Sequence, residues 1–154
     1  GNLSSVGVDK IEFLIRTNPG EEPKPLAKIA SGGELSRIML AIKSIIAKSD
    51  SIATLIFDEI DTGVSGKASR KIGLKLKEVG KNAQVICVTH SAQIASAADS
   101  HFLIKKEYTD NAAFTQIMPL DFEGRKYELA RIMGGLNVTE SLLKSAEEML
   151  DNGN

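Results

Sequence analysis

Hydrophobic residues recur along the chain at two spacings, one typical of strands and one typical of helices. Alternating apolar residues and short, nearly all-apolar runs predict strands, whereas apolar residues three and four positions apart predict amphipathic helices. Between the first strand and the first helix, Pro19, Pro23 and Pro25 are expected to break regular structure. The predicted order is a strand at 8–16, a helix from Ser31, a strand at 53–57, a helix at 68–79, a strand at 84–88, a helix at 91–98, strands at 101–105 and 113–118, and helices at 123–133 and 139–150.

This order of elements predicts an α/β fold with a largely parallel sheet flanked by helices. A strand, helix, strand, helix, strand succession is typical of right-handed parallel crossovers. The chain has 154 residues, about the length of one domain. We therefore expect residues 1–154 to form a single domain that buries roughly 70% of its unfolded surface.

Composition and charge exclude several classes of protein. Hydrophobic residues make up 42% and charged residues 25%, which argues against disorder and against a disulfide scaffold. The net charge of −1 gives no general attraction to nucleic acid or to an anionic membrane. The apolar run 38–42 is too short to span a bilayer, and the first residues do not have the pattern of a signal peptide. The single cysteine, Cys87, is expected to be a buried thiol in a cytoplasmic protein.

A serine, two glycines and a glutamate, Ser31 to Glu34, stand where the first predicted helix begins. The free amides and the positive end of the helix dipole at such a position attract anions. Glycines let the backbone approach a phosphate closely, and the Ser31 hydroxyl adds a directed hydrogen bond. An ordinary serine cap followed by flexible glycines explains the same residues equally well. On its own, this motif leaves both interpretations open.

Two acids and a histidine follow the two buried apolar runs. Asp58 and Glu59 end the first run, and His90 ends the second. Ligands of α/β sheets bind beyond the carboxyl ends of strands, so Asp58 would hold Mg²⁺, Glu59 would polarise a water, and His90 would contact a phosphate oxygen or that water. The alternative is that these are ordinary surface residues at strand ends. His101 lacks this setting and is expected to be structural.

The three motifs occur in the order and spacing of one known group of proteins. Residues 30–37, Ala-Ser-Gly-Gly-Glu-Leu-Ser-Arg, resemble the signature motif of ATP-binding-cassette ATPases in the SMC-like branch. Residues 55–59 resemble the Walker B strand of that family, Asp61 resembles its D-loop, and His90 its switch histidine. The resemblance covers nearly the whole chain, and it implies the C-terminal lobe of an ATPase head.

Two departures from transporter cassettes favour DNA maintenance over transport. Ala30 replaces a leucine and Glu34 replaces a glutamine, a variation usual in the SMC-like group. Residues 28–37 and 57–66 are most similar to a bacterial ATPase of recombinational repair of DNA double-strand breaks. The expected association with DNA and the nucleoid comes entirely from this resemblance, through the full-length protein.

The resemblance also implies a role for each motif residue, with ATP and Mg²⁺ as ligands. Asp58 would serve magnesium, Glu59 would activate the hydrolytic water, and His90 would sense the γ-phosphate. Asp61 would bridge two heads of a homodimer. The residues that would bind the γ-phosphate of ATP held by the other head belong to the signature motif: Ser31, Gly32, Gly33 and Glu34.

One motif of these ATPases is missing from the sequence. A Walker A loop has the pattern G-x-x-x-x-G-K-[ST], but Gly66-Lys67 precedes Ala68, and Gly80-Lys81 precedes Asn82. In SMC-like proteins that loop lies in an N-terminal lobe, beyond a long coiled coil. The chain is therefore expected to be a half-head that needs an N-terminal Walker A lobe as partner. Alone it is expected to be inactive, because phosphoryl transfer depends on the missing lysine and amides.

Two other classes of function fit part of the sequence. A metal-dependent nuclease or phosphatase would use Asp58, Glu59, Asp61 and His90 around one or two divalent cations. That reading explains the acids but gives the Ser-Gly-Gly motif no special role. A non-catalytic interaction module is the third reading, against which the intact Glu59 and His90 argue.

Overall fold

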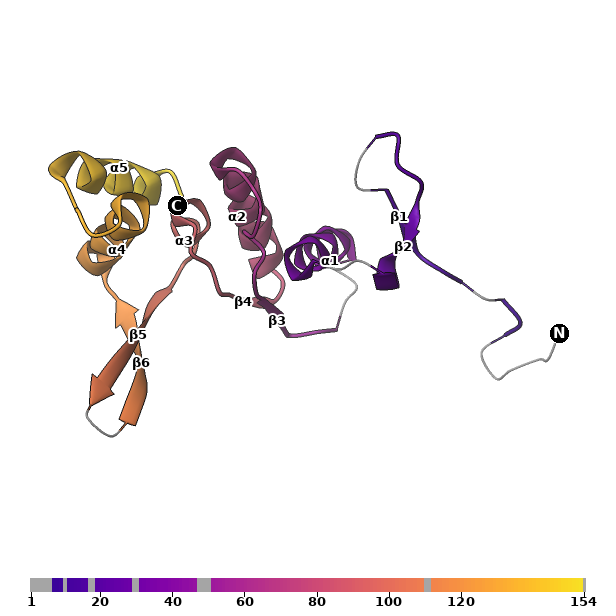
Figure 1. The fold of residues 1–154 in the computed structure, drawn as a ribbon, viewed down its shortest axis with the longest axis horizontal. Helices are drawn as coiled ribbons and strands as arrows, with labels where there is room; N and C mark the ends of the chain where they lie inside the picture. The colour runs from indigo at the N-terminus through magenta and orange to yellow at the C-terminus, as the bar shows by residue number, and fades with distance from the viewer. Residues whose placement is uncertain are drawn as a thin grey trace.

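A computed structural model describes residues 7–9, 11–16, 19–28, 31–46, 51–109 and 112–153. Figure 1 shows the helices and strands arranged in a row from the N-terminus toward the C-terminal helices. The motif residue Ala30 lies outside the described residues. The elements are β1 (Leu14–Ile15), β2 (Lys24–Pro25), the 3₁₀ helix η1 (Leu26–Lys28), α1 (Gly32–Ile46), β3 (Thr54–Phe57), α2 (Gly66–Gly80), β4 (Gln84–Cys87), α3 (Ala92–Ala95), β5 (His101–Thr109), β6 (Ala112–Leu120), α4 (Phe122–Gly134) and α5 (Glu140–Asp151).

The α/β class is confirmed, and its parallel part consists of β3 and β4. These strands pair in parallel register from Thr54 with Gln84 to Phe57 with Cys87, and α2 forms the crossover between them. The other described pairs, β1–β2 and β5–β6, are antiparallel, so the described strands do not form the largely parallel sheet that we expected. Only two residues separate β5 from β6, whereas a parallel connection needs a dozen or more.

The N-terminal part differs from the prediction in two ways. Of the strand expected at 8–16, only Leu14–Ile15 is assigned, and Pro25 lies within β2 although the prolines were expected to break regular structure. A proline is tolerated there because β2 pairs on one side only, as an edge strand. The amide of Leu26 donates to the carbonyl of Phe13 and extends the contact between the two segments (2.8 Å).

The apolar side chains form two clusters that meet at α3. The first joins α1, β3 and α2, and the second joins α4 and α5. Ile94 of α3 belongs to the first cluster, and Ala92 and Ala95 belong to the second. Gly73 lets α2 approach α3, because a Cβ there would lie 3.1 Å from the carbonyl oxygen of Gln93 and 3.2 Å from Cβ of Ala97. The first cluster is the one that supports the ends of β3 and β4.

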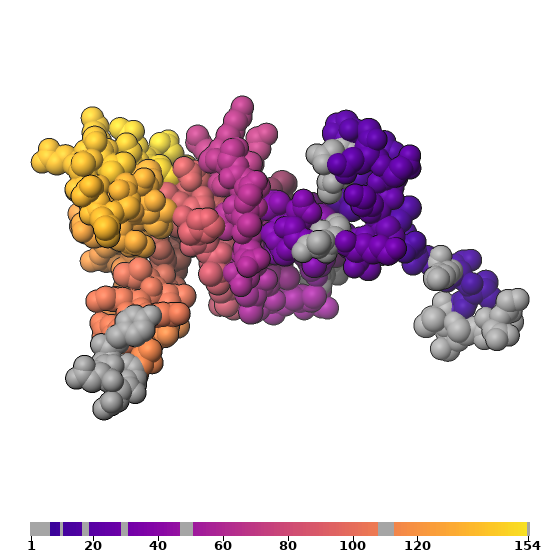
Figure 2. All heavy atoms as spheres, viewed as in Figure 1, coloured from indigo at the N-terminus to yellow at the C-terminus, as the bar shows by residue number. Residues whose placement is uncertain are grey.

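The chain exposes more surface than a compact protein of its size. Its accessible surface is 11,141 Å², against about 7,500 Å² for a typical 16.5 kDa monomer. It therefore buries about half of its unfolded surface, less than the roughly 70% that we expected. Figure 2 shows the β5–β6 hairpin extending away from the helices. Along β3, Phe57 is buried at 4% exposure, while its neighbour Ile56 is 71% exposed on the other face of the sheet.

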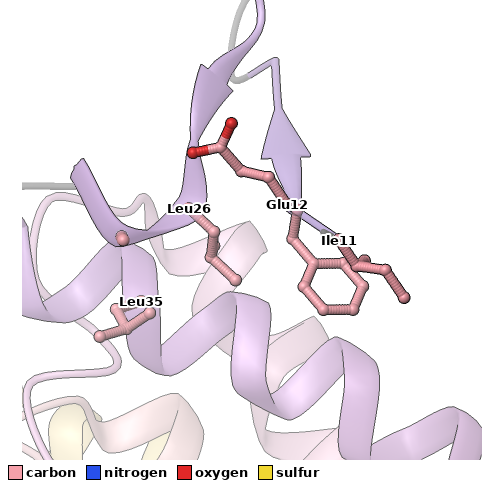
Figure 3. A pocket seen from close by; sticks show the side chains of 6 residues that line it. Ile11, Glu12, Leu26 and Leu35 are labelled. Carbon is pink, nitrogen blue, oxygen red and sulfur yellow. The ribbon is translucent and has the colours of Figure 1, made fainter. Parts of the chain in front are cut away.

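A hollow of about 410 Å³ lies between β1, η1 and the start of α1 (Figure 3). Its lining is apolar apart from Glu12, and includes Ile11, Phe13, Leu26 and Leu35. An apolar hollow with one carboxylate does not suit a phosphate.

Within the described ranges, none of the helices combines the length and the apolar character needed to cross a lipid bilayer.

Candidate functional site

The parallel pairing of β3 and β4 brings the predicted acids and histidine to one edge of the sheet. Phe57 and Cys87 are register partners, and the amide of Val88 donates to the carbonyl of Phe57 (2.9 Å). Glu59 and His90, two and three residues beyond the strands, are both exposed at this edge. The carboxylate and the imidazole therefore both follow the carboxyl edge of this sheet, and each is exposed to solvent.

The start of α1 packs against the Glu59 segment. A Cβ on Gly32 would lie 2.8 Å from Oε2 of Glu59, and a Cβ on Gly33 would lie 2.7 Å from its backbone oxygen. Gly33 therefore permits a close approach between two backbone segments, whereas Gly32 faces the movable end of the Glu59 side chain. Oγ of Ser31 accepts a long hydrogen bond from the amide of Glu34 (3.4 Å), which makes Ser31 the cap of α1. The Ser-Gly-Gly motif and the Glu59 segment are thus in contact.

Glu59 has an unusual backbone conformation, held by several hydrogen bonds. Its φ angle is 56°, in the left-handed region that non-glycine residues rarely adopt. Its carbonyl accepts from the amide of Thr62 (3.0 Å), and its amide donates to Oδ1 of Asp58 (2.8 Å). Such strain persists where the surrounding structure fixes it, and it is common at functional sites.

Two polar side chains of α1 also hold this segment. Oγ of Ser36 donates to the carbonyl of Asp58 (2.8 Å). Nη1 of Arg37 donates to the carbonyls of Ile60 (3.2 Å) and Thr62 (2.9 Å). No role for Ser36 or Arg37 follows from the motif alone. Ser36 and Arg37 lie four residues after Gly32 and Gly33 and therefore on the same helix face. This spacing is the sequence feature from which their contact with the segment could have been predicted.

Asp61 lies inside the molecule, between the ends of β3 and β4. It is 5% exposed, and its Oδ2 accepts from Oγ1 of Thr89 (2.5 Å) and from the amide of His90 (3.0 Å). Nδ1 of His90 lies 3.2 Å from the same oxygen. The resemblance assigns Asp61 to a contact between two heads. In this structure its carboxylate points inward and joins two loops of one chain.

The thiol of Cys87 is free and lies near two of these carboxylates. Partial burial, followed by the charges of Asp61 and Asp58, raises the pKa of Cys87 to about 12.

Because the thiolate is the nucleophile, the folded chain is expected to react with a disulfide reagent at pH 8 at least about tenfold more slowly than the urea-unfolded chain. Absorbance of the released thiol measures both rates. Asp58→Asn should speed the folded reaction, and equal folded and unfolded rates would contradict this account.

The described residues contain no group of three or more histidine, cysteine or acidic side chains placed to hold a metal ion. A nuclease with one or two divalent cations needs such a cluster. Asp61, one of its four proposed ligands, is buried and engaged by Thr89 and His90. The nuclease or phosphatase alternative therefore has no support in this geometry. Asp58, which is exposed, suits a different arrangement, in which one carboxylate shares Mg²⁺ with nucleotide oxygens.

Comparisons with known proteins agree with the motifs. No protein-family model matches the chain. It is 45% identical over 148 residues to DNA repair protein RecN of Bacillus subtilis, an alignment that covers 96% of this chain and 26% of that protein. It is also 45% identical over 149 residues to DNA repair protein RecN of Haemophilus influenzae, covering 97% of this chain and 27% of that protein. The chain thus spans about a quarter of the length of these relatives.

A solved structure shows the same fold. It comes from work on ATP-driven dimerization and DNA-stimulated activation of SMC ATPases, and it matches 80% of this chain and 81% of its own with a TM-score of 0.51 and 24% identity. The sequence relatives identify the segment, and this structure identifies the fold. The chain is therefore a homologue of a C-terminal segment of RecN, with the fold of an SMC-type ATPase head.

Proposed function

We propose that this chain is the part of a RecN-like DNA repair ATPase that completes ATP binding and hydrolysis with a Walker A lobe. The observation that carries the proposal is the packing of α1 on the Glu59 segment, at the sheet edge where His90 is also exposed. Three motifs far apart in the sequence meet in one region, in a homologue of RecN. A set of unrelated surface residues would not require Gly32 and Gly33 to lie against Glu59.

Each side chain has a chemical part in this proposal. Glu59, exposed and held by the loop around it, accepts a proton from the attacking water. His90 contacts the γ-phosphate, and the exposed helix start at Gly32 acts on a phosphate that a second head presents, while the buried Gly33 lets α1 pack on the Glu59 segment. Asp58 would hold Mg²⁺, which when bound neutralises phosphate charge. Ser31 and Glu34 fix the start of α1 through their hydrogen bond.

The exposed apolar surface supports a requirement for partners. The outer face of β3 and β4 presents Ile56, Ile86 and Val88 to solvent, and exposed patches of this kind usually mark interaction sites. The proposed partners are an N-terminal Walker A lobe and a second head. The work on ATP-driven dimerization of SMC ATPases supports the second of these. DNA would be bound by the full-length protein, in the cytoplasm and at the nucleoid.

The test is to measure ATP hydrolysis by this chain with and without a Walker A lobe taken from a RecN relative. The chain alone should show no turnover above background, because the lysine and amides that hold the β- and γ-phosphates are missing from its sequence. The pair should hydrolyse ATP. A lobe with its Walker A lysine replaced by alanine is the control. Turnover by the chain alone at the rate of the pair would contradict the proposed division of roles.

A further inference from the structure

Asp61 connects the two loops that carry Glu59 and His90, and we infer that it is the positioning residue that fixes His90 for ATP hydrolysis. This inference rests on the proposed function, because His90 acts on a phosphate only there. It gives Asp61 a contact inside one chain, in addition to the contact between two heads that the resemblance implies.

One oxygen of Asp61 accepts two hydrogen bonds from the His90 loop and lies near the His90 ring. Oγ1 of Thr89 and the amide of His90 donate to Oδ2 at 2.5 and 3.0 Å, and Nδ1 of His90 lies 3.2 Å from the same atom. The backbone and the ring of His90 are therefore held by one carboxylate. The carboxylate beside the ring favours a proton on Nδ1, which leaves Nε2 as the ring nitrogen free to contact a ligand. The side chain of His90 is 81% exposed, so a ligand can reach it.

The burial of Asp61 is difficult to explain by stability alone. Its Oδ1 is buried and has no hydrogen-bond partner among the described residues. A buried carboxylate oxygen without a donor costs free energy. The ring that Asp61 contacts is mostly in solvent, where a polar contact contributes little to stability. An arrangement that costs stability while holding an exposed imidazole in one orientation is expected where that orientation matters.

The same loop also places Asp61 relative to Glu59. Asp61 is two residues beyond Glu59. The amide of Thr62 donates to the carbonyl of Glu59 (3.0 Å) and closes a tight turn that contains Asp61. Arg37 donates to the carbonyls of Ile60 and Thr62, on both sides of Asp61. The carboxylate that orients His90 is thus built into the turn that holds Glu59. A shift of either loop would change the distance between the two groups.

The test compares Asp61→Asn with Glu128→Gln in the chain paired with a Walker A lobe. Glu128 is a second buried carboxylate, hydrogen-bonded to Arg131 in α4 and outside the proposed site. Asp61→Asn should lower kcat about 10- to 100-fold, and it should change KM for ATP less than about twofold. The loss in kcat is taken from residues that hydrogen-bond to and orient histidines at metal sites, whose replacement has effects of this size. Glu128→Gln should lower the melting temperature without lowering kcat.

Long-range ¹H–¹⁵N NMR of the His90 ring gives a readout that does not depend on turnover. The wild-type chain in the pair should show a proton on Nδ1 at pH 8.5, and Asp61→Asn should shift the ring toward a mixture of tautomers. A proton on Nε2 in the wild type would overturn the inference without any substitution. So would equal kcat values for Asp61→Asn and Glu128→Gln. If the wild-type pair hydrolyses no ATP, the proposed function fails instead, and with it the catalytic part of this inference.

Discussion

Glu59→Gln is expected to lower ATP hydrolysis by the chain paired with a Walker A lobe by about 100-fold or more, the usual contribution of a general base. The amide has nearly the same shape as the carboxylate but does not accept a proton from water. Glu59 is exposed, and its backbone is fixed by the amide of Thr62 and by Oδ1 of Asp58, so the exchange should leave the loop in place. The measurement is steady-state phosphate release at saturating ATP.

Binding should survive this substitution. ATP-dependent association of heads, followed by light scattering or sedimentation, is expected to persist or increase, because nucleotide is bound but not consumed. The matched control is Glu78→Gln, which removes an exposed carboxylate on α2 that pairs with Lys75. That pair is exposed and contributes little to stability, so turnover should stay within error of the wild type. Loss of association together with turnover would assign Glu59 to binding instead of proton transfer.

The secondary structure and the sheet edge were predictable from local patterns. Apolar runs at β3 and β4, each followed by polar residues, indicated two parallel strands whose carboxyl ends meet. The pairing of β5 with β6 was also encoded locally, because the short connection between them excludes a parallel arrangement. The prediction of a largely parallel sheet counted strands without testing how long the connections are.

The internal contacts of the site were not predictable in the same way. Asp61 bonds to residues 28 and 29 positions away, and Arg37 bonds to carbonyls 23 and 25 positions away. Hydrophobic periodicity says nothing about contacts between polar groups at such separations. An acid that follows a strand is expected to be exposed, yet Asp61 is buried, where Thr89 and the amide of His90 donate to it.

The glycines of the signature motif are explained differently by sequence and by structure. The sequence suggests that they leave room for a phosphate. The structure shows that Gly33 leaves room for the backbone of Glu59 and for Thr62, whose Cβ would lie 3.2 Å from an added methyl group. The two explanations are compatible because they apply to different glycines. Gly32 faces the flexible end of the Glu59 side chain, which can move aside, and Gly33 faces backbone. They differ in what an added methyl group would disturb.

Gly33→Ala is expected to destabilise the chain by about 1–3 kcal/mol, the usual cost of inserting a methyl group into a packed site. Its Cβ would stand 2.7 Å from the carbonyl oxygen of Glu59 and 3.1 Å from Nη1 of Arg37, and a backbone atom cannot move aside cheaply. Urea unfolding followed by circular dichroism measures the change. Gly80→Ala is the control, because no atom lies within 4 Å of its added Cβ at the end of α2. Higher helix propensity should make it neutral or stabilising by up to about 1 kcal/mol.

Gly32→Ala separates stability from function at the same helix start. Its Cβ would lie 2.8 Å from Oε2 of Glu59, the mobile end of a side chain, so the carboxylate should move and the fold should be nearly unaffected. Turnover in the pair should therefore fall for both alanine variants, whereas only Gly33→Ala should lower the free energy of unfolding strongly. Equal, small stability changes at Gly33 and Gly80 would show that α1 does not pack on the Glu59 segment in solution, and the common site would be lost with that contact.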